Sequence, residues 1–151
     1  MLVVIYETKF TSVFSVVCSA VTASGYSHGA ILSDGVLYDT TFTRGHFAPA
    51  PPVEATRKVA VIDVGGDCAE WVLANLGVKY DTLGLLLWFF RVSTVGRMYC
   101  FNVVENALAS NSVRLNLGWR KSGGTILTAL LNKGYPVEVL TGKKFNERYL
   151  T

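Results

Sequence analysis

Two residues of this 151-residue chain could act together as a nucleophile and its base: His28 and Cys100. His28 lies in the strand-like run YSHGAIL, shortly before the turn residues Asp34 and Gly35. Cys100 lies in YCFNVVENAL, at the start of a run with helical spacing. The dipole at a helix N-terminus favours the thiolate form of a cysteine, and an imidazole on a sheet edge can accept the proton. A thiol and an adjacent base are the two groups that nucleophilic catalysis by cysteine requires at least.

The patterns around this pair predict an α+β domain in which an antiparallel sheet packs against helices, because strands come early in the chain and helices late. We expect strands at 2–8, 26–33, 36–42, 57–64 and 135–141, and helices at 11–24, 67–76, 99–110 and 125–134. Asp67 is the expected N-cap of the second helix. The prolines of 48–55 predict an irregular loop.

A third residue can orient the imidazole. Asp34-Gly35 predicts a tight hairpin, which brings the strand that ends near Asp39 back beside His28. Side chains alternate along a strand, so only one of Asp39 and Thr40 can face the imidazole. We choose Asp39, because a carboxylate both fixes the tautomer and stabilises the imidazolium. Thr40 is the alternative, since a register shift of one residue would exchange the two.

Other residues with reactive side chains are assigned structural roles. Cys18 and Cys68 lie in helical apolar patterns and are predicted to be core residues. Three cysteines cannot all pair, and no CxxC or zinc-type cluster occurs, so we expect no metal and no cofactor. His46 is interpreted as a solvated loop residue and Asp81 as a loop or cap acid. Residues 142–144, GKK, lack the glycine pattern of a phosphate-binding loop.

Composition limits the partners. Charged residues make up 17% of the chain, below the ~25% usual for soluble domains, which favours a protein assembly or homo-oligomer. The net charge of +3, without a Lys/Arg run, argues against nucleic acid. The N-terminus lacks the pattern of a signal peptide. The apolar run 83–90, LGLLLWFF, is too short to span a bilayer and is predicted to be a buried helix. We expect a reducing, cytoplasmic setting or a virion.

With these motifs in order, the chain resembles the circularly permuted branch of the NlpC-type papain-like cysteine hydrolases. That branch includes the YiiX-like proteins and lecithin retinol acyltransferase. The matching segments are SHGAI (27–31), GVLYD (35–39), GVKYD (77–81) and YCFNVV (99–104), spread over roughly residues 1–135. The histidine precedes the cysteine, the reverse of the papain order. Phe101 and Asn102 depart from the small or polar residue and the glutamate usual after the cysteine.

The resemblance implies a single permuted papain-like domain over 1–151, with Cys100, His28 and Asp39 carrying out acyl-enzyme chemistry. It implies a peptide or amide substrate, with peptidoglycan peptides favoured, and short members of this kind are common in phage genomes. One alternative is an acyltransferase or esterase acting on lipid-like substrates, with 83–90 lining an acyl pocket. Another is a catalytically silent fold that serves as a binding or assembly module of a virion.

Overall fold

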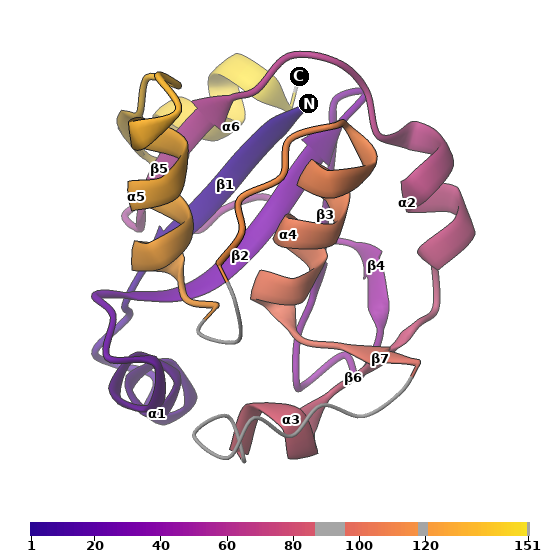
Figure 1. The fold of residues 1–151 in the computed structure, drawn as a ribbon. Coiled ribbons are helices and arrows are strands. Elements are labelled where there is room, and N and C mark those ends of the chain that lie inside the picture. The colour runs from indigo at the N-terminus through magenta and orange to yellow at the C-terminus, as the bar shows by residue number, and fades with distance from the viewer. Residues whose placement is uncertain (87–95, 118–120, 151) are drawn as a thin grey trace.

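A computed structural model describes residues 1–86, 96–117 and 121–150 of the chain. Six strands form one antiparallel sheet in the order β4-β3-β2-β1-β5-β8 (Figure 1). Their bounds are β1 Leu2–Glu7, β2 Tyr26–Ser33, β3 Val36–Thr40, β4 Phe47–Pro49, β5 Lys58–Asp63 and β8 Glu138–Thr141. Two short strands, β6 Lys79–Tyr80 and β7 Arg97–Met98, pair in parallel apart from this sheet. The expected α+β class with an antiparallel sheet is confirmed.

Six helices are seen in the described part of the chain. They are α1 Val13–Thr22, α2 Ala69–Asn75, α3 Thr82–Leu86, α4 Cys100–Ser110, α5 Gly123–Asn132 and α6 Gly142–Tyr149. Helices α4 and α5 cross one face of the sheet, and α6 lies behind it (Figure 1). No helix among these is long and apolar enough to cross a membrane.

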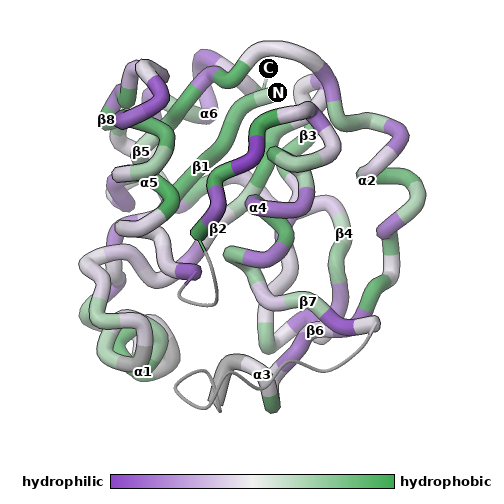
Figure 2. Tube along the Cα trace, in the orientation of Figure 1, coloured by the Kyte–Doolittle hydropathy of each residue, from purple (hydrophilic) through white to green (hydrophobic). Residues whose placement is uncertain are grey.

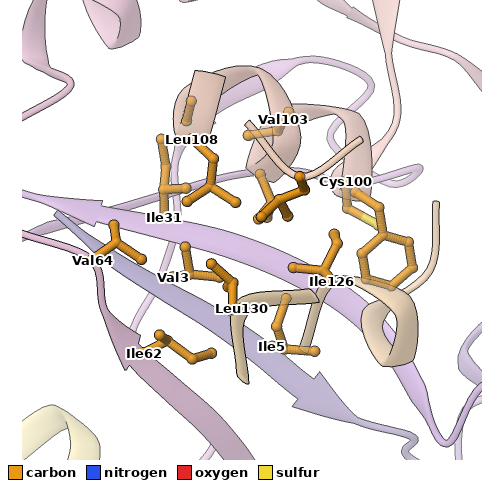
Figure 3. Packing of buried hydrophobic residues seen from close by; sticks show 14 of the residues in the cluster. Val3, Ile5, Ile31, Ile62, Val64, Cys100, Val103, Leu108, Ile126 and Leu130 are labelled. Atoms are coloured by element: carbon orange, nitrogen blue, oxygen red, sulfur yellow. The ribbon is translucent and has the colours of Figure 1, made fainter. Parts of the chain in front are cut away.

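The central strand β1 explains this layering. Its residues LVVIY form a continuous apolar run (Figure 2), as expected for a strand buried on both faces. Val3 and Ile5 pack beneath α4 and α5, together with Ile31, Val103 and Ile126 (Figure 3). The alternate residues of the strand face the second cluster, on the opposite side of the sheet, which is closed by Phe145 of α6.

The hairpin that positions the candidate site forms as expected. Asp34 and Gly35 both have positive φ, 50° and 73°, as a two-residue type I′ hairpin turn requires. The register pairs Ser33 with Val36 and Ile31 with Tyr38. This pairing determines where the rest of β3 lies relative to β2.

Four expectations about elements need correction. The segment 48–55 is not wholly irregular, since β4 reaches Pro49; as an edge strand, β4 tolerates a residue without an N–H. Helix α2 starts at Ala69 after the N-cap Cys68, one residue later than expected, although Asp67 Oδ1 still accepts the Ala69 N–H at 2.9 Å. Strand β2 is an inner strand rather than an edge. Helix α6 was not expected at all.

The apolar run 83–90 is only partly described. Helix α3 ends at Leu86, and residues 87–90 lie outside the described part of the chain. Leu83 is 51% exposed, so the expectation of a buried helix is wrong at this position.

Candidate active site

His28 and Asp39 are joined across the hairpin. His28 Nε2 lies 2.8 Å from Asp39 Oδ2, and both side chains are largely buried, with 16% and 8% of their surface exposed. The pairing of β2 with β3 covers only Ile31 to Ser33 on β2. His28 therefore lies beyond the paired part, where the side chain can turn toward the returning strand. Because Asp39 takes Nε2, the ring nitrogen left for another partner is Nδ1.

Arg44 holds the other oxygen of the Asp39 carboxylate. Its Nη1 donates to Asp39 Oδ1 at 2.6 Å and to the backbone oxygen of Ala48 at 3.2 Å. Burial acts to raise the pKa of Asp39, but the hydrogen bond to His28 and the charges of His28 and Arg44 outweigh it, so the pKa lies below its usual value. Asp39 is therefore a carboxylate near neutral pH, fixed at both oxygens.

The surroundings of His28 favour the imidazolium. Burial lowers its pKa, but the hydrogen bond to Asp39, the side-chain interaction with Cys100 and the charges of both raise it to about 9. The Tyr6 ring adds a packing contact, with the two ring centroids 5.1 Å apart. His28 is thus charged near neutral pH, and the groups that hold the charge are Asp39 on one side and Cys100 on the other.

Cys100 is the first residue of α4. The N-cap, Tyr99, has extended backbone and no side-chain capping bond, so the first N–H groups of the helix point outward without an intrahelical acceptor. Cys100 is only 3% exposed and yet lines the same cavity as His28. Figure 3 shows Cys100 at the end of α4, at the margin of the apolar core. A helix N-terminus stabilises negative charge, which suits a thiolate at this position.

A cavity of about 570 Å³ brings the three residues together. It lies beside β2 and the loop that follows β3, and its walls combine apolar and polar groups. The lining residues include Tyr6, Ser27, His28, Asp39, Phe42, Pro51, Pro52, Val53, Glu54, Arg57, Tyr80 and Cys100. Burial above all, and then the nearby Cys100, raises the pKa of Tyr80, so this hydroxyl stays protonated. Volumes of this size are typical of small-ligand sites.

The structure places the other sequence candidates away from this cluster. Thr40 is fully buried, and its Oγ1 has no hydrogen-bond partner in the described part of the chain. His46 is exposed, next to Lys79 in an isolated bridge. Asp81 Oδ1 accepts the Gly84 N–H at 2.8 Å, in the first turn of α3, as expected for a cap acid. Cys18 and Cys68 are buried free thiols.

Two residues of the site were not anticipated from the sequence. Arg44 is five positions after Asp39, and the spacing between an acid and a base across a loop carries no regular signal. Arg57, the residue just before β5, lines the cavity and donates to Ser27, thirty positions away. Within the described ranges, no group of three His, Cys, Asp or Glu side chains could hold a metal ion.

Comparison with known proteins adds no assignment. The chain matches no protein-family model, no curated protein and no solved structure.

Proposed function

We propose that this protein is a cysteine hydrolase of the circularly permuted papain-like type, which cleaves a peptide or amide bond through a Cys100 acyl-enzyme. The observation that carries the proposal is the joint placement of Cys100, His28 and Asp39 on one cavity, with the imidazole already bonded to the carboxylate. Such nucleophile, base and orienting groups recur wherever acyl transfer uses a side-chain nucleophile. The motifs that resemble the permuted family supply the fold assignment.

The proposed reaction begins from the ion pair in which the Cys100 thiol proton already lies on Nδ1 of His28, in keeping with the imidazolium that the surroundings of His28 favour. The thiolate then attacks the carbonyl carbon, forming the C–S bond as the carbonyl electron pair moves to oxygen. When the tetrahedral intermediate collapses, the C–N bond breaks and the imidazolium protonates the leaving amine. Water, deprotonated by His28, attacks the thioester, and the acid product and the thiol are released.

The developing oxyanion also has a partner. The backbone N–H of Cys100 starts α4 and has no intrahelical acceptor. Because this donor is part of the backbone, it is fixed before the substrate arrives, and fixed donors are worth several kcal/mol when charge develops on oxygen, on the order of 3 kcal/mol for one donor.

Cysteine labelling tests the nucleophile directly. Burial, followed by the charge of Cys100, raises the pKa of Cys18 to about 12, and burial also raises the pKa of Cys68. We expect iodoacetamide at pH 7 to modify Cys100 first, and a cysteine-directed acyl probe to label Cys100 alone. Mass spectrometry of the intact folded protein identifies the modified residue. Labelling of Cys100 no faster than of Cys18 or Cys68 would remove the basis of the proposal.

A substrate panel then defines the bond that is cleaved. Muropeptides are the first peptide substrates to test, with Cys100→Ala as the inactive control. Short-chain acyl esters form the second arm, because Phe42, Pro51, Pro52 and Val53 give one wall of the cavity an apolar character that also suits an acyl chain. Turnover of esters with none of muropeptides would favour the acyltransferase or esterase alternative.

A further inference from the structure

Arg57 is a charged group in the cavity that the proposed chemistry does not use. Arg57 immediately precedes β5, and its guanidinium lies over the Tyr6 ring, 4.8 Å from the ring centroid. Tyr6 in turn packs on His28, at 5.1 Å between ring centroids. One aromatic ring therefore separates Arg57 from the candidate base.

Two nitrogens of the guanidinium, Nε and Nη2, have hydrogen-bond acceptors in the protein, and the third, Nη1, has none among the described residues. Nε and Nη2 donate to the backbone oxygen of Glu7, each at 3.2 Å, and Nη2 donates to Ser27 Oγ at 3.2 Å. Ser15 Oγ donates to the same Ser27 hydroxyl at 2.6 Å and so ties it to α1. For Nη1, the described residues provide no hydrogen-bond acceptor. Its two N–H groups are available to a ligand.

The charge of Arg57 is also left without an ion-pair partner in the described part of the chain. The two carboxylates of the cavity are engaged elsewhere: Asp39 pairs with His28 and Arg44, and Glu54 pairs with Lys9 at 2.5 Å. The charge of Glu54 still acts on Arg57, but Glu54 is bonded to Lys9 and makes no direct ion pair with the half-buried guanidinium. A fixed fork of donors with one free nitrogen is suited to an oxyanion supplied by a ligand.

We propose that Arg57 binds a carboxylate of the substrate, at a position removed from the scissile bond by the width of the Tyr6 ring. The inference rests on the proposed function in one respect, that the same cavity receives the substrate. It adds a specificity: acidic peptides, or peptides that end in a free carboxylate close to the cleaved bond, are preferred over neutral ones.

The test uses three thiol-directed probes of similar size: bromoacetyl-glycine, bromoacetyl-glycinamide and bromoacetyl-phosphoethanolamine. We expect Cys100 to react about tenfold faster with the glycine probe than with the glycinamide probe, because one charge-assisted hydrogen bond is worth that much. Arg57→Gln should bring the ratio of the two rates close to one, and Arg57→Lys should keep part of it. Taking the ratio removes any general loss of reactivity.

Lys58→Gln is the matched control. It removes the same charge from the next residue, whose exposed side chain does not line the cavity of Cys100, so the ratio should stay at the wild-type value. An unchanged ratio in Arg57→Gln, or an equal loss in Lys58→Gln, would overturn the assignment. Faster reaction with the phosphoethanolamine probe than with the glycine probe would overturn the choice of a carboxylate.

A binding measurement keeps this inference separate from the nucleophile. In Cys100→Ala, N-acetylglycine should bind and shift the Arg57 side-chain NMR signal, whereas N-acetylglycinamide should not. Slow labelling of Cys100 together with this shift would refute the cysteine chemistry and support the carboxylate site. Normal labelling of Cys100 without the NMR shift would support the cysteine chemistry and refute the carboxylate site. A thermal melt of each variant establishes that the fold is retained.

Discussion

Gly29 brings helix α4 into close contact with strand β2. A Cβ atom at this position would lie 3.0 Å from Val104 Cγ2 and 3.2 Å from Phe101 Cδ1. A Cβ atom here would force α4 or these two side chains to move by a few tenths of an ångström, and Gly29 directly follows His28. The distance between the base and the nucleophile at the start of α4 thus depends on this contact. Phe101, which departs from the usual family residue, forms part of the same contact.

Gly29→Ala should move α4 outward by a few tenths of an ångström and slow the alkylation of Cys100 about tenfold, because small displacements of a nucleophile are costly. Overpacking should also lower the stability by roughly 1–3 kcal/mol. Gly25→Ala is the control, since a Cβ there meets nothing within 4 Å. Iodoacetamide kinetics with urea unfolding measure both effects. Equal alkylation rates in the two variants would show that α4 does not need this close approach.

Asp39→Asn should keep the fold and reduce turnover by roughly two to four orders of magnitude, as is typical for the orienting acid of such a site. The pKa of His28 should fall from about 9, because the carboxylate that raises it is replaced by a neutral amide. An NMR titration of the imidazole measures the shift. If the His28 pKa were unchanged in Asp39→Asn but moved in Thr40→Val, the residue that orients His28 would be Thr40.

The sequence predicts that Asp39 or Thr40 meets His28, because a two-residue turn leaves few registers open, and Asp39 is preferred for the chemistry of its carboxylate. Once Asp34 and Gly35 form the turn, the strand positions follow by counting, and the alternation of side chains separates Asp39 from Thr40. The helix that begins at Cys100 could also be predicted from the sequence, because Val103, Val104, Ala107 and Leu108 repeat with helical spacing. All four are buried in the structure.

The residues that sequence reasoning missed act over distances that local patterns do not encode. Arg57 and Ser27 meet only because β5, β1 and β2 are neighbours in the sheet. Helix α6 has a single buried aromatic residue, Phe145, supported by Tyr149 one turn later at 5.3 Å between ring centroids. The segment is short and mostly polar, so a single apolar pair is the only part of it that points to packing against the core.

Cys100→Ala and His28→Ala should each abolish turnover and leave the melting temperature close to that of the wild type. The double variant should be no worse than either single one, because a nucleophile and its base act as a unit. Steady-state rates of all three variants on one substrate measure the coupling. Additive losses, or near-normal turnover in His28→Ala, would mean that Cys100 relies on a different base.

Thr40→Val should stabilise the protein by about 1 kcal/mol, because the Thr40 hydroxyl is buried without a hydrogen-bond partner in the described part of the chain. Valine has nearly the same shape and removes the cost of burying an unpaired polar group. Turnover should not change. Urea unfolding of the wild type and the variant measures the difference, and a loss of stability would mean that the hydroxyl has a partner, for example a bound water.

The pH dependence of stability provides a test of the His28–Asp39 pair that needs no substrate. His28 titrates near 6.5 in an unfolded chain and at about 9 in the folded one. Its stabilising effect is therefore complete below pH 6.5 and is lost as the pH rises through about 9, by up to about 1.4 kcal/mol per pH unit.

The contribution of Asp39 to stability depends on pH in the opposite direction. Its folded pKa lies below the ordinary 3.8, so its contribution is present above that pH and disappears as the pH falls through the folded value. The free energy of unfolding of the wild type relative to His28→Gln should thus be largest between about pH 4 and 6.5 and should decline on both sides. Urea unfolding of both proteins at pH 3, 5.5, 7.5 and 9.5 measures this difference. A difference that is flat from pH 5.5 to 9.5 would mean that His28 is neutral in the folded protein, and that the proton of Cys100 meets an imidazole rather than an imidazolium.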